Sequence, residues 1–314
     1  MESAVSSIEA VNNEEVTLTS CPGCQSENLQ FFIEQKASKH LKLNRVFKIM
    51  KCTDCTLRFV ANPISAEELE KVYSANFFST SQQTVPIDQD GHFTDHSKAW
   101  PLYMNSLRRV ERIRKIADGG RLLDVGCARG YFLKIASEYF EVAGTDISKD
   151  ACEYASSVLG LDVITGDFLT VPLEENAYDL VTMWDVLASI PKPAEAVARV
   201  SRILKTGGRF IFTVPDMDSL SFKILRHKWP LLIPPINMTY YNRRSVENLL
   251  KRNGFEIEQY KFEGKLLSVN FVLRKLGRIF NLPFLDSPRA RIPLIRNVYL
   301  NLFDIATVYA VKKS

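Results

Sequence analysis

The sequence predicts an α/β fold built on a mostly parallel sheet and preceded by a small cysteine-rich module. From residue 121 onward, short apolar segments alternate with helical ones, the pattern of a parallel sheet covered by helices on both faces. The turn Gly126–Gly130 directly follows the first of these apolar segments. Two C-x-x-C pairs precede them, Cys21–Cys24 and Cys52–Cys55. These features predict two structural units of different kinds.

Length and composition are those of a globular protein. The chain has 314 residues, and ~100–200 residues per domain predicts two units. Hydrophobic residues make up 46% and charged residues 24%, which excludes coiled-coil and wholly disordered chains. No stretch reaches the ~18 uninterrupted apolar residues of a membrane span, and the N-terminus lacks a basic segment followed by an apolar one. We therefore expect a cytoplasmic protein.

The expected elements follow the alternation of apolar and helical segments. A helix with many bases is expected over Pro101–Ile116, ending at Gly119-Gly120. Further helices are expected from near Tyr131 and over Arg243–Arg252. The strands of the sheet are predicted at Arg121–Val125, Phe140–Thr145, Asp162–Thr165, Asp179–Met183, Arg209–Val214, Phe255–Phe262 and Ile305–Val311.

The two cysteine pairs have the spacing of a zinc ribbon. Cys21, Cys24, Cys52 and Cys55 offer four thiolates that can surround one Zn²⁺ tetrahedrally, with no open position, so the expected metal is structural. A redox pair and a site that has lost its metal are the alternatives, but a redox C-x-x-C normally opens a helix. Strand-like residues 45–50 and 57–60 flank the second pair, and a short helix is expected over 65–72.

Bases recur in the cysteine-rich segment about every third residue, from Lys36 to Lys51. A solvated face explains them, and contact with nucleic acid is the alternative. Single-strand binding uses aromatic side chains interleaved with the bases, and only Phe47 lies among these. The pattern therefore argues against nucleic acid as a partner.

Acidic side chains follow three successive strands of the predicted sheet. Asp124 stands just before a G-x-A-x-G turn, which lacks the spacing of the dinucleotide fingerprint and suits a cationic ligand such as an amino acid ammonium. Asp146, at the next strand end, can accept both hydroxyls of a ribose. Asp167 and Phe168 can supply a carboxylate for an exocyclic amine and a wall for a purine. Because the carboxyl ends of parallel strands meet at one edge, these groups are expected to share one crevice.

The ordered series of these segments, with Trp184-Asp185-Val186-Leu187 after the fourth strand, resembles class I S-adenosylmethionine-dependent methyltransferases. The resemblance covers residues 100–314 and implies a Rossmann-like seven-stranded sheet whose last strand is antiparallel. It implies S-adenosylmethionine as cofactor. The cofactor-binding residues that it implies are Asp124, Gly126, Cys127, Ala128, Gly130, Asp146, Ile147, Asp167, Phe168 and Trp184. Residues 21–63 resemble the zinc-binding N-terminal region of some sugar and small-molecule methyltransferases.

The resemblance leaves the catalytic residues open. Ala188-Ser189 stands where many relatives carry Glu-His, and Asn237 stands where relatives often carry His. Neither position therefore offers an evident acid or base. The remaining candidates for a catalytic role are Asp185, His227, Tyr240 and Tyr241.

Residues 266–280 are expected to form an amphipathic helix, with Val269 and Leu273 on its apolar face and Arg274, Lys275 and Arg278 elsewhere. Such a helix packs on its own core or lies on anionic lipid or against a lipid-linked acceptor. Residues 266–300 are therefore the place where a peripheral membrane contact is expected, if there is one.

The expected organisation is a flexible tail (1–20), a zinc ribbon (21–63), a helical linker or lid (64–120) and a methyltransferase domain (121–314) with an insertion at 263–303. The main hypothesis is an enzyme that methylates a small-molecule or sugar-derived acceptor, including a lipid-linked one. The alternatives are a zinc-ribbon RNA methyltransferase and a catalytically silent cofactor-binding protein. The sequence leaves the acceptor, the methylated atom and the oligomeric state open.

Overall fold

The computed structural model describes residues 17–37, 41, 43–65, 68, 72, 96–282, 284–285 and 297–313; of residues 96–100 it describes the backbone only. Most of the expected tail, and much of the expected linker or lid, lie outside the described residues. Of the short helix expected over 65–72, the described part includes its start, where Ser65 Oγ accepts a hydrogen bond from Glu68 N at 3.1 Å.

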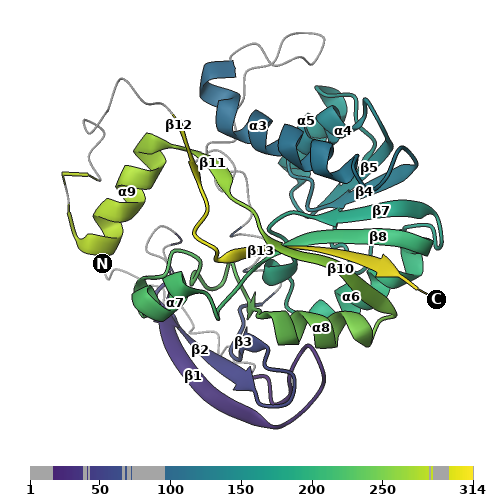
Figure 1. The fold of residues 1–314 in the computed structure, drawn as a ribbon. Coiled ribbons are helices and arrows are strands. Elements are labelled where there is room, and N and C mark those ends of the chain that lie inside the picture. Colours follow the sequence, from purple (N-terminus) through teal and green to yellow (C-terminus); the bar gives the residue numbers. More distant parts are fainter. Residues whose placement is uncertain are drawn as a thin grey trace, which may run out of the picture.

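A seven-stranded sheet forms the centre of the molecule (Figure 1). Its strands lie in the order β10-β13-β8-β7-β4-β5-β6. Strands β8, β7, β4, β5 and β6 are parallel, and β13 is antiparallel to both of its neighbours. The bounds are β4 Arg121–Val125, β5 Glu141–Asp146, β6 Val163–Thr165, β7 Tyr178–Met183, β8 Leu204–Pro215, β10 Phe255–Phe262 and β13 Ile305–Lys312. The predicted α/β fold with an antiparallel last strand is confirmed.

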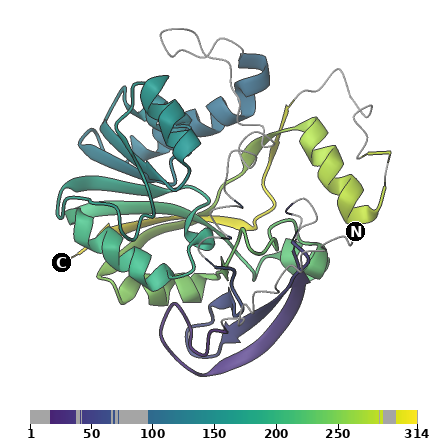
Figure 2. The same cartoon turned by 180° about the vertical axis from the view of Figure 1, so that it is seen from behind.

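Helices cover both faces of this sheet, as Figure 2 shows from behind. Apolar residues of α3, α4 and α5 share one core cluster, and those of α6 and α8 share another with the opposite face of the sheet. Each helix therefore buries one apolar side, as its pattern of apolar residues requires. The helices are α3 His96–Ile113, α4 Tyr131–Ala136, α5 Lys149–Ser157, α6 Pro193–Ile203 and α8 Arg243–Lys251.

The insertion between β10 and β13 differs from the single helix expected over 266–280. A strand, β11 (Lys265–Ser268), comes first and pairs with β12 (Asn297–Leu300). The helix α9 (Val269–Phe280) begins only where Ser268 Oγ accepts a hydrogen bond from Phe271 N at 3.2 Å. A side-chain oxygen that bonds the first free N–H groups fixes a helix start, so this serine sets the boundary.

The cysteine-rich segment joins the rest of the chain through a shared sheet. Strands β1 (Leu29–Lys36), β2 (Val46–Cys52) and β3 (Arg58–Val60) are antiparallel, and β9 (Thr239–Tyr240) pairs with β3 from almost 180 residues further along. The shorter elements near β9 are α7 (Leu220–Leu225) and two 3₁₀ turns, η2 (Leu187–Ser189) and η3 (Arg226–Lys228). Among the helices of the described residues, none has the length and hydropathy needed to cross a bilayer.

Candidate functional site

The turn after β4 has glycines where no other residue fits. Gly126 has a φ of +73°, and a Cβ added there would lie 2.3 Å from Val186 Cγ2. Gly130 has a φ of +77°, and its added Cβ would lie 2.5 Å from Leu161 Cδ1. Glycine tolerates positive φ and lacks the atom that would clash. The glycines thus let the turn pack closely against the protein itself as well as present its backbone at the sheet edge.

Asp146, at the end of β5, holds this turn in place. Its Oδ2 accepts a hydrogen bond from Ala128 N at 2.8 Å, and its Oδ1 accepts one from Ser148 N at 2.8 Å. Ser148, not Asp146, is the N-cap of α5. A carboxylate offers about four lone-pair positions, so Asp146 can still accept a hydrogen bond from a ligand. Asp146 is 8% exposed and lies beside the turn Gly126–Gly130, which the sequence predicts to be part of a ligand site.

Asp124, at the end of β4, is a buried carboxyl group without a closely bound cation among the described residues. It is 3% exposed, and its Oδ1 accepts a hydrogen bond from Thr182 Oγ1 at 2.6 Å. Burial raises the pKa of Asp124 to about 7, although the Thr182 hydrogen bond and the charge of Arg109 oppose the rise. A cationic ligand would stabilise the ionised form and restore an ordinary pKa.

The residues after β5 and β6 divide between the surface of the sheet edge and the core. Asp167 is exposed, and its Oδ1 accepts a hydrogen bond from Leu169 N at 2.9 Å. Ile147 is 38% exposed although it is apolar and adjoins Asp146. Phe168 is 6% exposed, belongs to the main core cluster and lies under the guanidinium of Arg199. Ile147 therefore presents the apolar surface here.

Trp184 directly follows β7. Its ring meets Phe132 edge-on with centroids 5.6 Å apart, and the Arg109 guanidinium carbon lies 4.4 Å from the ring centroid. Its Nε1 is buried and has no hydrogen-bond partner in the described part of the protein. A buried indole N–H normally has a partner, so this donor is available to a ligand.

A pocket open to solvent lies beside Trp184; the empty space in and above it is about 350 Å³. Its walls come from α3, from the ends of β7, β8 and β13, and from the turn between β10 and β11. Asn105 of α3 fixes one wall, because its side chain donates to Leu266 O at 2.9 Å and accepts from Leu266 N at 2.8 Å. The lining residues are Asn105, Arg108, Arg109, Arg112, Trp184, Thr213, Glu263, Gly264, Lys265, Ile305 and Thr307.

Asp185 meets the bases of this pocket. Its Oδ2 lies 2.6 Å from Lys265 Nζ and 3.4 Å from Arg109 Nη2, and its Oδ1 accepts a hydrogen bond from Thr213 Oγ1 at 3.0 Å. Desolvation by the surrounding protein would raise the pKa of Asp185, but the charges of Lys265 and Arg109 hold it well below the ordinary value. A carboxylate that remains ionised to such low pH is a weak base.

The other three candidates for a catalytic role do not line this pocket. His227 is exposed, and its Nδ1 lies 3.3 Å from Gln35 Oε1 of the cysteine-rich segment. Tyr240 and Tyr241 are fully buried in and beside β9, and burial raises the pKa of both phenols far above the ordinary value. Tyr240 OH donates to Asn237 O at 3.0 Å, a contact within its own segment.

The sequence reasoning missed Arg109 and Lys265 as site residues. The bases of α3 are visible in the sequence, but no motif connects them with the insertion. Arg108 and Arg112 stand four residues apart on one helical face, and that spacing was the available signal. Lys265 adjoins Leu266, which hydrogen-bonds to Asn105, 161 residues away in the chain, so its place at the pocket depends on tertiary packing.

Comparison with known proteins connects this geometry with a family. Residues 102–260 match the family model described as a methyltransferase domain, which spans half of the chain. The chain belongs to the methyltransferase family. The ubiquinone biosynthesis O-methyltransferase of Alkalilimnicola ehrlichii is 34% identical over 180 residues, which cover 49% of this chain and 72% of that enzyme.

Two further similarities extend the comparison. An uncharacterized 37.1 kDa protein in transposon TN4556 of Streptomyces fradiae is 31% identical over 144 residues, and the match covers 43% of this chain and 39% of that protein. Magnesium protoporphyrin IX methyltransferase of Synechocystis PCC 6803, solved with bound SAH, superposes with a TM-score of 0.52 at 15% identity, covering 80% of this chain and all of that one. The methyltransferase domain and the fold support S-adenosylmethionine as the cofactor.

The four paired cysteines of this methyltransferase converge at one point. Their Sγ atoms all lie within 4.8 Å of one another; the pair Cys21–Cys55 is 3.5 Å apart and the pair Cys24–Cys52 is 3.6 Å apart. Both knuckles turn in the same way, with a residue of positive φ one position past the second cysteine, Gln25 and Thr56. The second turn is further held by Thr56 Oγ1, which donates to Asn242 Oδ1 at 2.9 Å.

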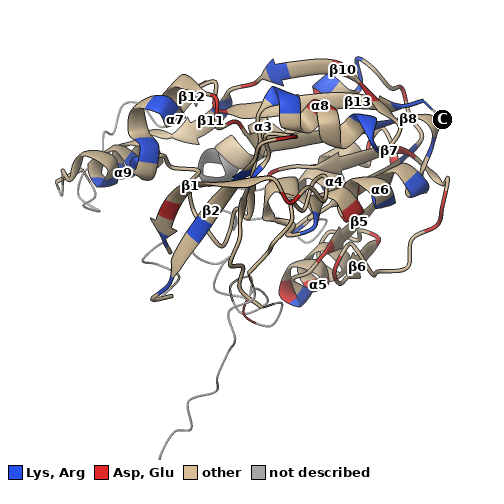
Figure 3. Cartoon of the chain, turned by 90° about the horizontal axis from the view of Figure 1, so that it is seen from below, with Lys and Arg blue, Asp and Glu red and all other residues tan. Residues whose placement is uncertain are grey.

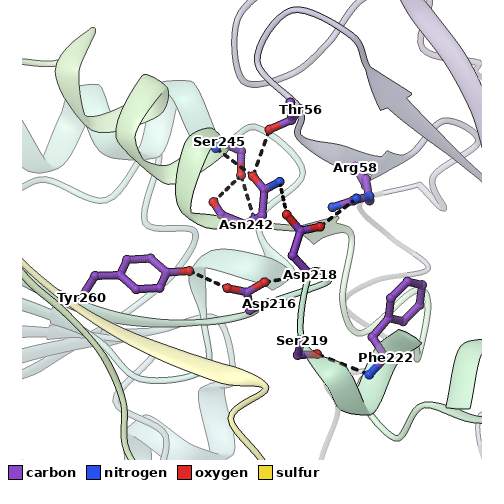
Figure 4. A network of polar contacts seen from close by, with 9 residues as sticks. All are labelled: Thr56, Arg58, Asp216, Asp218, Ser219, Phe222, Asn242, Ser245 and Tyr260. Carbon is purple, nitrogen blue, oxygen red and sulfur yellow. Dashed lines mark hydrogen bonds and ion pairs between the residues drawn. The ribbon is translucent and has the colours of Figure 1, made fainter. Parts of the chain in front are cut away.

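A polar network connects this cysteine cluster with the methyltransferase sheet (Figure 4). Asp218 accepts hydrogen bonds from Arg58 Nη2 at 3.0 Å and from Asn242 Nδ2 at 2.8 Å. Asn242 also caps α8, and its Oδ1 accepts from Ser245 N at 2.9 Å. Asn242 thus bonds both to Thr56 of the cysteine-rich segment and to α8 of the catalytic domain. The two units share hydrogen bonds as well as a sheet.

Proposed function

We propose that this methyltransferase binds S-adenosylmethionine in the crevice at the ends of β4, β5 and β6 and acts on a small-molecule or sugar-derived acceptor, including a lipid-linked one, in the adjoining pocket. The observation that carries the proposal is the row of three carboxyl groups, Asp124, Asp146 and Asp167, beside a pocket lined by bases. Ligands of open α/β sheets bind at this edge.

The residues of the crevice fit the cofactor. S-adenosylmethionine presents hydrogen-bond donors and positive charge: an ammonium, a sulfonium, two ribose hydroxyls and an adenine amine. Asp124 would accept the ammonium, Asp146 the ribose hydroxyls with its remaining lone pairs, and Asp167 the amine. Ile147 would lie against the adenine. Trp184 Nε1, a buried donor without a partner among the described residues, could donate a hydrogen bond to a bound ligand. The residues of the turn after β4 would line the base of the cofactor site with their backbone; they are Gly126, Cys127, Ala128 and Gly130.

Bound S-adenosylmethionine supplies an activated methyl group, which leaves the protein the tasks of alignment and exclusion of water. Asp185, held ionised between Lys265 and Arg109, orients these two cations at the pocket. We therefore assign Asp185 a positioning role and not that of a general base. The buried phenols of Tyr240 and Tyr241 support β9 and its neighbours.

The acceptor class follows from the pocket and the relatives. The pocket is lined mostly by charged and polar side chains, which suits a polar part of a small molecule. Relatives named for ubiquinone biosynthesis support a small-molecule acceptor. Arg45, one of the bases that raised the question of nucleic acid, donates to the carbonyl groups of Asn62 and Pro63 and so serves the fold.

The cysteine cluster fits a structural Zn²⁺. With Zn–S distances of ~2.3 Å, tetrahedral geometry places ligand sulfurs about 3.8 Å apart. The sulfur pairs at 3.5 and 3.6 Å stand close to that spacing. Four thiolates would complete the coordination and leave no position for a substrate.

The function is tested by incubating the protein with labelled S-adenosylmethionine and a small-molecule extract. We expect S-adenosylhomocysteine to accumulate and a labelled product to be found by mass spectrometry. Calorimetry with S-adenosylhomocysteine tests the cofactor separately. Absence of any binding by the folded protein would overturn the crevice assignment, and label found only in RNA would overturn the acceptor class.

A further inference from the structure

The pocket holds more positive than negative charge. Arg108, Arg109, Arg112 and Lys265 line it, and Glu263 is the one carboxylate among the lining residues, with Asp185 beside it. Arg112 pairs with Glu263 at 3.0 Å, and Asp185 is shared between Lys265 and Arg109. Four cations against two carboxylates leave a net charge of +2 in a partly enclosed space, where charges act more strongly than in bulk water.

Donors in the pocket also outnumber their acceptors. Arg108 stacks on Tyr299 of β12, with its guanidinium carbon 5.0 Å from the ring centroid. Its Nη1 is buried and makes no hydrogen bond within the described chain. Trp184 Nε1, which also lines the pocket, is likewise buried and makes no hydrogen bond to the described residues. Buried donors without acceptors are costly, and a bound anion would satisfy them.

We propose that this pocket binds an anionic group of the acceptor, a phosphate or a carboxylate, through Arg108 and Lys265. The inference rests on the proposed function and names the acceptor's chemistry. Binding of the anion would place the acceptor between α3 and the paired strands β11 and β12, next to Trp184. The insertion would thus contribute to specificity, because it carries both Lys265 and Tyr299.

The cofactor's own carboxylate is the other source of such an anion. The position of the pocket favours the acceptor. Ile305 and Thr307 on β13 and Thr213 on β8 line it, whereas the cofactor crevice lies at β4, β5 and β6, on the other side of β7 in the strand order. If the cofactor's carboxylate fills the pocket, bound S-adenosylhomocysteine will exclude other anions. If the pocket serves the acceptor, it will still bind an anion when S-adenosylhomocysteine is present.

The test is a titration of inorganic phosphate and pyrophosphate into the protein saturated with S-adenosylhomocysteine, at constant ionic strength. We expect both anions to bind and pyrophosphate to bind more tightly. Arg108→Gln and Lys265→Gln should each weaken pyrophosphate by about tenfold or more, because each removes a hydrogen bond to a charged group. Arg114→Gln, an exposed base just past the end of α3, is the matched control and should change nothing.

The outcomes separate this inference from the proposed function. No anion binding to the S-adenosylhomocysteine complex, or equal binding in all three variants, overturns the inference while the cofactor assignment stands. If Arg108→Gln weakens S-adenosylhomocysteine but not 5′-methylthioadenosine, and the complex takes no anion, the pocket serves the cofactor's carboxylate. Failure of S-adenosylhomocysteine to bind the native protein would instead remove the proposed function.

A second inference rests on a different face. Gly277 is the one buried residue of α9, although the helix is strongly apolar on one side. Leu276 and Phe280 are 38% and 59% exposed, and Arg274 and Arg278 stand exposed among them. On α7 and the turn after it, Leu220 and Ile224 are 70% and 69% exposed, next to the exposed bases Lys223, Arg226 and Lys228.

These two helices lie on the same side of the molecule in all three views (Figures 1, 2 and 3). Figure 3 shows basic positions on both. Apolar side chains surrounded by bases match the chemistry of an anionic lipid surface, where the apolar groups enter the headgroup region and the bases meet the charge. We infer that α9 and α7 dock this methyltransferase on anionic membranes.

Sedimentation with vesicles of phosphatidylcholine, with and without phosphatidylserine, tests the docking. We expect binding only with phosphatidylserine and release by salt. Arg274→Glu with Lys275→Glu should weaken binding by about tenfold or more, and Leu276→Ser with Phe280→Ser should weaken it at every salt concentration. Arg114→Glu with Lys115→Glu is the control of equal charge. No sedimentation at low salt, or equal loss in the control, would overturn the inference.

Discussion

The two halves of the active-site edge differ in charge and in origin. The proposed cofactor crevice at β4, β5 and β6 carries carboxyl groups at or just after the strand ends, within about 45 residues of chain. The pocket carries bases from α3 and from the insertion, more than 150 residues apart. One region is set by local strand–turn–helix units and the other by tertiary packing. A cationic cofactor and an anionic acceptor would each find opposite charge.

The first test asks whether either region depends on the cysteine cluster, and it has the largest expected effect. Cys52→Ser removes one of four thiolates, so it should release the metal and lower the free energy of unfolding by more than about 4 kcal/mol. S-adenosylhomocysteine affinity of the folded fraction should change little, because the crevice lies at the ends of β4, β5 and β6.

Native mass spectrometry checks this prediction. It should find one Zn²⁺ per chain in the reduced native protein and none in Cys52→Ser. Cys152→Ser, at a buried cysteine outside the cluster, should keep the metal. Freshly purified native protein without metal would contradict the assignment. Equal losses of stability and cofactor affinity would make the cysteine-rich segment part of the active site.

The second test concerns the turn Gly126–Gly130, which belongs to the cofactor crevice and not to the pocket. Gly126→Ala places a Cβ 2.3 Å from Val186 at a φ of +73°, so we expect a loss of about 2–4 kcal/mol in unfolding free energy. Val186→Ala in the same chain should restore the unfolding free energy that is lost to the clash. The loss that comes from the positive φ of the backbone should remain. Denaturant titration of the three variants measures both. Additive losses would show that the two residues do not meet.

The strands that carry the three carboxyl groups could be predicted because each is a short apolar segment of the sequence. Arg121–Val125 and Phe255–Phe262 were predicted with the bounds that the structure has. The start of β8 at Leu204 was missed, since Lys205-Thr-Gly-Gly resembles a turn and a register shift occurs there. Strand β9 has only two residues, and it is defined by its pairing with β3. A strand of this length has no local sequence pattern that would predict it.

The roles of single residues were harder to predict than their positions. The sequence indicated Asp146 as a ribose acceptor but not as the anchor of the turn, because the contact with Ala128 N depends on the shape of the folded turn. Phe168 follows an acidic residue as a ligand wall would, yet it lies in the core under Arg199. The insertion was predicted as one helix because apolar spacing alone does not show where Ser268 caps it.

The third test separates the two roles of Asp146. Hydrogen bonds to charged groups contribute about 1.5–3 kcal/mol, so Asp146→Ala should weaken S-adenosylmethionine and S-adenosylhomocysteine roughly 10- to 150-fold. A 2′-deoxy analogue should bind the native protein poorly and lose little more in the variant. If Asp146 served only to hold Ala128 and Ser148, the variant would lose the same factor with both ligands. Native-like affinity of a folded variant would remove Asp146 from the cofactor site.

The last test uses Asp124, where the acidic crevice and the bases of α3 meet most directly. The pKa of Asp124 is raised to about 7, because burial and the charge of Asp146 outweigh the Thr182 hydrogen bond and the charge of Arg109. Below pH 7 the free protein therefore holds this carboxyl mostly protonated. The ammonium group shared by S-adenosylmethionine and S-adenosylhomocysteine would bind the ionised form, so the proton must leave as either ligand binds.

Affinity for S-adenosylhomocysteine should accordingly be level above pH 7 and fall below it, approaching tenfold per pH unit. The sign for the unliganded fold is the opposite: because the folded pKa lies above the unfolded value of ~3.9, Asp124 makes the free protein more stable as pH falls from 7 towards 4. Calorimetry at pH 6 in two buffers of different ionisation enthalpy should detect proton release on binding. Asp124→Asn, which cannot titrate, should bind more weakly with a flat profile over this range. A pH-dependent affinity in Asp124→Asn equal to that of the native protein would assign the proton to another group and leave the crevice without its acceptor for the ammonium.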